Sequence, residues 1–315
     1  MKPSLELLNR PWVGAVLWLL GLAIPLVLDQ TWVFIASLFA VYAIVALSQD
    51  IVLGRAGMFD MGHAVYFGVG AYVTAILNTA FGWPILLTWP LAVVAAGLVG
   101  GLIAAPIARL RGDYLLVATI GFNAIFILAL DNNLGHVTGG ADGVFGIGVP
   151  ALFGWQAGSQ NAQFWLDWAA FAAVLLLIRN LDRSHLGRTF YYIKHDQLAA
   201  TTMGVDTRKY RVLAFALGAA LAGFGGTLFA TLMAAVSPGA FVFTESVTLF
   251  AIVRVGGQGS IPGVLLGTAL MFVVPQAFRS FAEYRYFVFG IAMVVIMVLR
   301  PQGIWPRMAR GEVSQ

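Results

Sequence analysis

Cysteine is absent from the sequence, and charged residues are scarce. None of the 315 residues is cysteine, 10% are charged and 60% are hydrophobic, whereas about 25% of a typical soluble domain is charged. The absence of thiols excludes disulfide bonds, zinc–thiolate centres and cysteine nucleophiles. The shortage of charge leaves too little polar surface for a compact chain in water. The composition therefore indicates a protein that lies in a lipid bilayer.

Motifs for phosphate binding and catalysis are also absent. No Gly-x-x-x-x-Gly-Lys-Ser/Thr loop occurs, so the chain has no loop of this kind to cradle ATP. The four histidines, His63, His136, His185 and His195, are scattered and show no spacing typical of a metal site or a catalytic triad. We therefore expect no enzyme activity on this chain, with no catalytic residue, metal or cofactor.

Long apolar runs occupy most of the chain. A helix needs about 20 apolar residues to cross the hydrocarbon core of a bilayer, so these runs predict a single all-α membrane domain, 1–315, with about ten spanning helices. The predicted spans are 12–28, 31–49, 60–79, 85–108, 114–130, 163–178, 212–236, 241–255, 260–278 and 286–299. Two of them, 60–79 and 241–255, are short or rich in polar residues and glycine. They fit broken or re-entrant helices equally well.

Lysine and arginine predict the orientation of these spans. With a cytoplasmic N-terminus, 16 of the 18 Lys and Arg residues fall on the cytoplasmic side, and only Arg279 and Arg285 fall outside. This is the distribution that the positive-inside rule describes. Both termini are then cytoplasmic, with 131–162 as the external loop and 179–211 as the main cytoplasmic segment. The basic residues thus indicate orientation in a membrane, and no nucleic-acid partner is expected.

The spans divide evenly around the external loop. Five lie before 131–162 and five after it, so the two halves would have opposite orientations. Such a division permits a 5+5 inverted repeat of the kind found in many transporters.

Two of the predicted spans carry small residues at every fourth position. This spacing places them on one helix face, where small side chains let helix backbones approach closely in lipid. The two sets are Ala92, Ala96, Gly100 and Ala104, and Gly218, Ala222, Gly226 and Ala230. We interpret both sets as packing faces and assign them no role toward a substrate.

Polar side chains are concentrated in the third and fifth predicted spans. Polar groups at membrane depth are costly and face protein or water, not lipid. Two interpretations remain open: the residues line a translocation pathway, or they pack between helices with their polar groups satisfied. The candidates for the pathway are Asp60, His63, Tyr66, Thr74 and Asn78 in the third span, and Thr119 and Asn123 in the fifth.

The cytoplasmic segment 179–211 contains a second candidate site. Residues 189–203 are predicted to form one short helix, and Gly204 is a natural C-terminal stop. A helix held between two spans would be a rigid element through which a cytoplasmic partner could move those spans. An ordinary basic loop beside anionic lipid is the alternative interpretation.

Four stretches, in register, resemble one known family. The longest reads Gly57-Met-Phe-Asp-Met-Gly-His-Ala-Val-Tyr-Phe-Gly-Val-Gly-Ala-Tyr72. It resembles the Gly-His-Ala-x-x-Phe-Gly-x-Gly-Ala-Tyr motif of branched-chain amino-acid ABC transporter permeases. Residues 111–122, 138–143 and 256–263 match further stretches in the same order, and 188–215 resembles the family's cytoplasmic loop.

The resemblance implies a permease subunit of an ATP-binding-cassette importer in a bacterial inner membrane. It implies four kinds of partner: a second homologous permease subunit, two ATPase subunits that bind ATP, an external substrate-binding protein and the lipid bilayer. It also implies that 189–203 is the helix that couples the permease to the ATPase. The coupling candidates are Arg188, Tyr191, Tyr192, Lys194, Asp196, Gln197, Met203 and Gly204.

Two departures from the family pattern leave the substrate open. Asp60 stands where the family often has Ser, and Ala124 stands near a position where many members have Glu. The substrate classes that remain are branched-chain or related amino acids, urea, short amides and small organic acids. A stand-alone secondary transporter or channel is the alternative of another class, and Asp60 with Asp131 is its only support.

Overall fold

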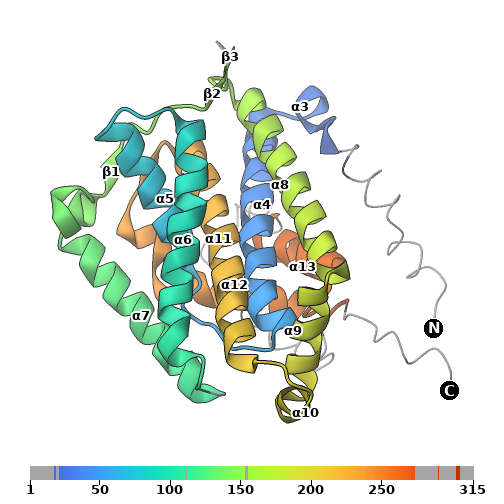
Figure 1. Ribbon diagram of the computed structural model, residues 1–315. Helices are drawn as coiled ribbons and strands as arrows, with labels where there is room; N and C mark the ends of the chain where they lie inside the picture. Colours follow the sequence, from blue (N-terminus) through green and yellow to red (C-terminus); the bar gives the residue numbers. More distant parts are fainter. Residues whose placement is uncertain are drawn as a thin grey trace.

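The computed structural model describes Trp18, residues 21–110, 112–152 and 155–273, Gly290 and residues 303–305, and its helices run mainly along one common direction (Figure 1). Within the described residues, six helices are long and apolar enough to cross a membrane. They are Gln30–Arg55, Ile85–Ile107, Asp113–Asp131, Gln160–Arg183, Thr207–Met233 and Pro238–Gly256. Two shorter apolar helices, Ala64–Thr79 and Ile261–Val273, lie among them. The chain is thus a multi-pass, mainly helical membrane protein.

Two of the ten predicted spans cannot be compared with the structure. About half of 12–28 and all of 286–299 except Gly290 lie outside the described residues, as do 274–278 at the end of the ninth span. The ten-span count, the side of the termini and the inverted halves therefore remain predictions. Of 12–28, the part from residue 21 onward is described and includes the short helix α3 (Ile24–Val27).

Helix α11 (Thr207–Met233) lies at the centre of the bundle, packed against α4 (Gln30–Asp50), α5 (Ala64–Thr79) and α6 (Ile85–Ile107). Small residues make this possible. A Cβ placed on Gly100 would collide with Ala219 of α11, and one placed on Gly226 would collide with the backbone of α5. The predicted packing faces on α6 and α11 are therefore confirmed as helix contacts.

The remaining long helices surround this centre. Helix α7 (Asp113–Asp131) lies on one flank, and α8 (Gln160–Arg183) packs against α4 on the other (Figure 1). The 3₁₀ turn η4 (Pro238–Phe241) leads into α12 (Phe243–Gly256), and α12 packs on α13 (Ile261–Thr268), which continues as the π-helical turn η5 (Ala269–Val273). The predicted span 241–255 is thus a helix of 14 residues preceded by a separate turn.

The third predicted span is shorter than expected. Helix α5 begins at Ala64, so Asp60–His63 are not helical as the prediction 60–79 required. Two local features explain the difference. Gly57 has a positive φ of 71°, and the Asp60 carboxylate accepts a hydrogen bond from the Gly62 N–H at 2.9 Å. An Asp side chain that binds the backbone two residues on favours a turn over a helix.

The second predicted span is longer than expected. Helix α4 passes without interruption into a π-helical turn, η1 (Ile51–Arg55), whereas the prediction ended at residue 49. The Ala56 N–H closes the wide turn by donating to the Ile51 carbonyl at 3.0 Å. Single π-turns of this kind are rare and often lie at functional sites.

The segment predicted as one cytoplasmic helix, 189–203, forms two helices. Helix α9 (His185–His195) begins four residues earlier than expected, and α10 (Gln197–Thr202) follows after a break at Asp196. Asp196 is extended, and its carboxylate caps α10 by accepting from the Ala199 N–H at 2.9 Å. The predicted stop at Gly204 is confirmed, because its φ of 83° allows the hydrogen bonds from Gly204 and Val205 that close α10.

The two ends of the bundle differ in charge. The lysines and arginines of the described residues gather where α8, α9, α10 and α11 meet, and we call this the basic end. The opposite end holds 131–162, which is folded rather than a plain loop. It contains the 3₁₀ turns η2 (Leu134–His136) and η3 (Gly140–Asp142), the hairpin of β2 (Ala151–Leu152) with β3 (Trp155–Gln156), and β1 (Val144–Phe145), which pairs antiparallel with β4 (Ala235–Val236).

Candidate functional site

A non-helical segment, residues 56–63, joins η1 to α5 inside the bundle. Most of its side chains are buried, and only Gly57 and Phe59 are exposed. Neighbouring helices hold its backbone: the Gln49 amide donates to the Asp60 carbonyl at 2.7 Å, and the Ala64 N–H donates to the Ser246 hydroxyl at 3.0 Å. A backbone without helical hydrogen bonds is tolerated at membrane depth only where protein or water satisfies it. Here side chains from α4 and α12 do so.

Asp60 and His63 form the polar centre of this segment. His63 Nδ1 lies 2.9 Å from Asp60 Oδ2, and His63 Nε2 lies 2.8 Å from the Ser48 hydroxyl of α4. The order Asp–His–Ser matches that of a hydrolytic triad, but all three residues have 0% exposure. Because no substrate can reach the Ser48 oxygen, this network positions the segment and carries out no nucleophilic chemistry.

Helix α7 supports the same segment through the second predicted polar face. The Met61 N–H donates to the Thr119 hydroxyl at 3.0 Å, and Asn123 donates to the Phe241 carbonyl at 3.2 Å. A Cβ on Gly62 would collide with the Thr119 carbonyl, so only glycine fits against α7 at this point. Thr119 therefore lies beside the Asp60–His63 pair, as the pathway prediction requires.

The rest of the predicted stripe extends away from this centre along α5. Tyr66 is buried, with its ring 5.4 Å from the His63 ring. Thr74 is also buried, and its hydroxyl has no hydrogen-bond partner among the described residues. Asn78 lies at the opposite end of the helix, where it accepts from the Gly148 N–H at 2.7 Å. The seven candidates thus do not form one cluster, and their role in a pathway remains a prediction.

A buried ionic cluster lies where α4, α8 and the loop after α12 meet. Arg55 forms an ion pair with Asp50 and a bidentate pair with Asp182, at 2.8 Å to Oδ1 and 3.1 Å to Oδ2. Asp50 also accepts from the Gly259 N–H at 2.7 Å. The sequence analysis missed this cluster because it treated Arg55 as a loop residue that marks orientation. The available signal was Asp50 at the end of an apolar run, five residues before Arg55.

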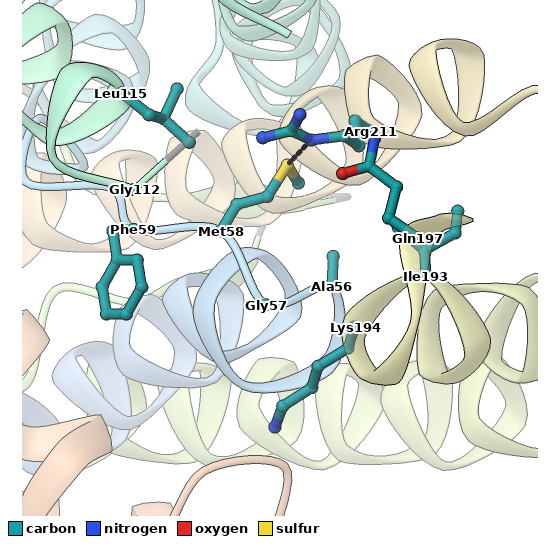
Figure 2. Close-up of a pocket in the computed structure, with 10 residues that line it drawn as sticks. All are labelled: Ala56, Gly57, Met58, Phe59, Gly112, Leu115, Ile193, Lys194, Gln197 and Arg211. Carbon is teal, nitrogen blue, oxygen red and sulfur yellow. Dashed lines mark hydrogen bonds between the residues drawn. The ribbon is translucent and has the colours of Figure 1, made fainter. Parts of the chain in front are cut away.

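A cavity of about 210 Å³ opens at the basic end (Figure 2). Arg211 is central to its wall: it donates to the Ala108 carbonyl at 2.6 Å, to the Leu110 carbonyl at 2.8 Å and to the Met58 sulfur at 3.2 Å. The lining residues come from 56–59, the start of α7, α9, α10 and α11; they include Phe59, Leu115, Ile193, Lys194, Gln197 and Arg211. The cavity therefore lies beside the non-helical segment and is bordered by α9 and α10.

Several of the predicted coupling residues lie on the outer surface of α9 and α10. Tyr192 is 59% exposed and Met203 84%, and Leu198, which was not predicted, is 74% exposed beside them. Lys194 points inward instead, and its ammonium donates to the Gly54 carbonyl at 2.6 Å. Gln197 donates to the Thr207 hydroxyl at 3.3 Å and lines the cavity. The coupling candidates thus comprise an exposed apolar group and an inward-facing group that contacts the bundle.

The described residues show no arrangement suited to a metal. Nowhere in that part of the chain do three His, Asp or Glu side chains gather closely enough to hold an ion.

Comparison with known proteins places the chain among transport proteins. The permease protein LivM of the high-affinity branched-chain amino acid transport system of Escherichia coli K12 is 35% identical over 313 residues, covering 92% of this chain and 73% of LivM. The LivH permease protein of Salmonella typhimurium is 26% identical, covering 89% and 94% of the two chains. A probable LivM permease of Methanocaldococcus jannaschii is 24% identical, covering 85% and 91%. No solved structure matches.

A family model extends this likeness over most of the fold. Residues 31–297 match the model of the permease component of branched-chain amino acid transport systems. The matched range runs from the start of α4 through α13 and includes the non-helical segment, the ionic cluster and helices α9 and α10. The chain therefore belongs to the family of permease components of branched-chain amino acid transport systems.

Proposed function

We propose that this chain is one of two membrane-spanning subunits of an ABC importer for a branched-chain or related amino acid. Its relatives carry the names of two different permease proteins, LivM and LivH, which supports a pair of homologous permeases. ATP is hydrolysed on two separate ATPase subunits, and an external binding protein delivers the substrate. The importer resides in a bacterial inner membrane, with the basic end in the cytoplasm.

The observation that carries this proposal, beside the family, is the exposed apolar surface of α9 and α10. Tyr192, Leu198 and Met203 project from two short helices that lie beyond the long spans, at the end rich in lysine and arginine (Figure 1). Large apolar side chains in the water layer leave apolar area uncovered, and such patches mark protein contacts. A cleft in an ATPase subunit is the occupant that the proposed function supplies.

The translocation pathway is proposed to pass beside the non-helical segment and α5. The Asp60–His63 pair and Thr119 hold the segment in place, while Thr74 offers a hydroxyl that the described residues leave unbonded. An unbonded hydroxyl at membrane depth is costly unless a ligand, water or another chain meets it. Thr74 is fully buried here, so a substrate would reach its hydroxyl only in a state of the permease pair in which α5 has moved.

Reconstitution tests the function and its alternatives. The chain is purified in mild detergent from its native cells, its companions are identified by mass spectrometry, and the complex is placed in liposomes with its binding protein. We expect an ATPase among the companions. We also expect ATP-dependent uptake of labelled leucine, and unlabelled valine should reduce this uptake by competition. Competition by urea, acetamide or lactate alone would assign another substrate class. Uptake by this chain alone, driven by an ion gradient, would establish a stand-alone transporter instead.

The exposed tyrosines test the coupling surface. Tyr191→Ala with Tyr192→Ala removes two aromatic side chains that would fill apolar pockets of an ATPase, and buried aromatics dominate interface energies. We expect about tenfold weaker ATPase binding or more, with loss of uptake and normal membrane insertion. Tyr114→Ala is the matched control, because Tyr114 is 79% exposed at the same end of the bundle but lies on α7. Equal loss in both variants, or in neither, would contradict the assignment.

A further inference from the structure

Helix α9, together with the end of α8 that leads into it, is fastened to two adjacent residues of the π-turn η1. Near its C-terminal end, the Lys194 ammonium donates to the Gly54 carbonyl at 2.6 Å. Near its N-terminal end, Asp182 forms the bidentate pair with Arg55 at 2.8 and 3.1 Å. Asp182 lies three residues before α9 begins. Gly54 and Arg55 are neighbours in sequence, so both attachments converge on one peptide unit.

The contact between Asp182 and α9 is tight. A Cβ on Gly187 would lie 3.0 Å from Asp182 Cα and would collide with the Leu181 carbonyl. Helix α9 therefore has no room to slide past the end of α8, which carries Asp182. At the other attachment, a Cβ on Gly57 would come within 2.8 Å of the Lys194 side chain. Helix α9 thus contacts η1 and lies against Gly57 through Lys194, and the end of α8 contacts η1 through Asp182.

The π-turn continues straight into the non-helical segment. Arg55 is followed by Ala56 and then by Gly57, whose positive φ redirects the chain toward Asp60 and His63. A hydrogen bond in the π-turn spans one residue more than a hydrogen bond in an α-helix. Conversion between the two therefore rotates the following residues around the helix axis. The adjoining cavity of about 210 Å³ gives the segment unfilled space on its α9 side.

We propose that η1 is the joint that transmits movement of α9 to the non-helical segment, with Lys194 and Asp182 as the positioning residues. This inference rests on the proposed function, because it assumes that an ATPase moves α9. The ion pair around Arg55 is buried and poorly screened by salt. It therefore keeps its geometry when α9 moves better than the exposed contacts of α10 do. Movement then passes from α9 to Gly54 and Arg55, and from there to Asp60 and His63.

The test separates coupling from assembly. Lys194→Met is combined with Asp182→Asn in the complete reconstituted transporter, where Arg55 still has Asp50 as a partner. We expect unchanged co-purification with the ATPase and ATP hydrolysis within about twofold of wild type, while leucine uptake falls about tenfold, the range measured for coupling residues. Lys209→Met is the control, because this exposed lysine forms an ion pair with Asp206, and the described residues hold no other ionic partner for it. It should leave both rates unchanged.

A cysteine reporter supplies a readout that a purely structural role would not change. The chain has no cysteine, so Phe59→Cys introduces a single thiol into this subunit, at the mouth of the cavity. In a Phe59→Cys transporter that still takes up leucine, we expect nucleotide to change the rate of maleimide labelling. The double variant should assemble and bind nucleotide but show no such change.

The outcomes are distinguishable. Normal uptake with normal nucleotide-dependent labelling in the double variant would overturn the joint and leave the importer intact. A wild-type chain without an ATPase companion would overturn the proposed function itself. Should the double variant fail to assemble, Lys194→Met alone decides, because it removes the Gly54 contact while Arg55 keeps both Asp50 and Asp182 as partners. Coupled uptake equal to wild type in that single variant would then overturn the joint.

Discussion

Two ion-pair sites at the basic end use the same kinds of residue in opposite surroundings. In the buried cluster, the side chains of Arg55 and Asp50 are 1% and 0% exposed. In the exposed pair, Lys209 and Asp206 are 83% and 48% exposed, with 3.2 Å between Nζ and Oδ2. The first joins three parts of the chain, from α4, α8 and the loop after α12. The second lies within one turn at the start of α11.

The comparison shows what burial adds to an ion pair. An exposed pair interacts through water and is screened by salt, so it contributes little to stability. A buried pair loses the hydration of both ions, and removing one partner leaves the other charged and unsolvated. Because Asp50 is buried, the folded protein requires Arg55 as its ionic partner. Lys209 can be replaced, because its partner Asp206 is exposed to water. The predictions below test this difference, beginning with the largest expected effect.

Replacing the buried arginine should be the most damaging change. Arg55→Met leaves the Asp50 carboxylate inside the bundle, with the Gly259 N–H as its remaining hydrogen-bond donor among the described residues. We expect a loss of about 3–5 kcal/mol of stability, as for other buried pairs deprived of one ion. Thermal unfolding of the purified protein in detergent measures this loss. A second variant, Arg55→Met with Asp50→Asn, should recover part of it because the orphaned charge is gone. A double variant no more stable than Arg55→Met would contradict the electrostatic account.

Much of the helical framework could be predicted from the sequence. The spans over α6, α7 and α8 agree with the structure to within a few residues, because long apolar runs in a bilayer admit few structures other than a helix. The packing faces were also predictable, since Gly100 and Gly226 fall on fixed four-residue repeats. Family membership followed from local motifs such as Gly57–Tyr72, which are recognisable without any knowledge of contacts.

The irregular parts could not be predicted, because tertiary contacts decide them. The π-turn η1 depends on Asp182 and Gly259, which lie far along the chain from Arg55. The non-helical Asp60–His63 depends on Ser48, Gln49 and Ser246, none of which a periodicity analysis marks as special. Polar residues that the sequence predicts to line a pathway can instead form a hydrogen-bond network within the protein. The contacts of each residue distinguish these two roles.

Removing the partly exposed acid of the buried cluster should have a smaller effect than removing Arg55. Asp182→Asn leaves Arg55 paired with Asp50, and the new amide can still accept one hydrogen bond. The Asp182 side chain is 19% exposed, so solvent already weakens its contribution. We expect a loss of about 1 kcal/mol, measured by the same thermal unfolding. A loss as large as that of Arg55→Met would mean that the three charges act as one unit.

The exposed pair should give the smallest effect, and that effect should depend on pH. The Lys209 backbone N–H, and then its side chain, lower the pKa of Asp206, which caps α11. A carboxylate with a lowered pKa stabilises the fold above its ordinary value of about 4. This contribution disappears as pH falls through the lowered folded value. Asp206→Asn keeps the cap, since Asn is as good an N-cap as Asp, and removes only the charge.

At pH 7 and low salt, Asp206→Asn should lower the melting temperature by less than Asp182→Asn does. The difference from wild type should vanish at 1 M salt, where screening is nearly complete, and again in acid, where wild-type Asp206 is itself neutral. The Arg55 variants should keep their deficit at 1 M salt, because ions do not enter the interior to screen Asp50. Equal salt sensitivity at the two sites would mean that water reaches Arg55, and that the buried cluster differs from the exposed pair only in position.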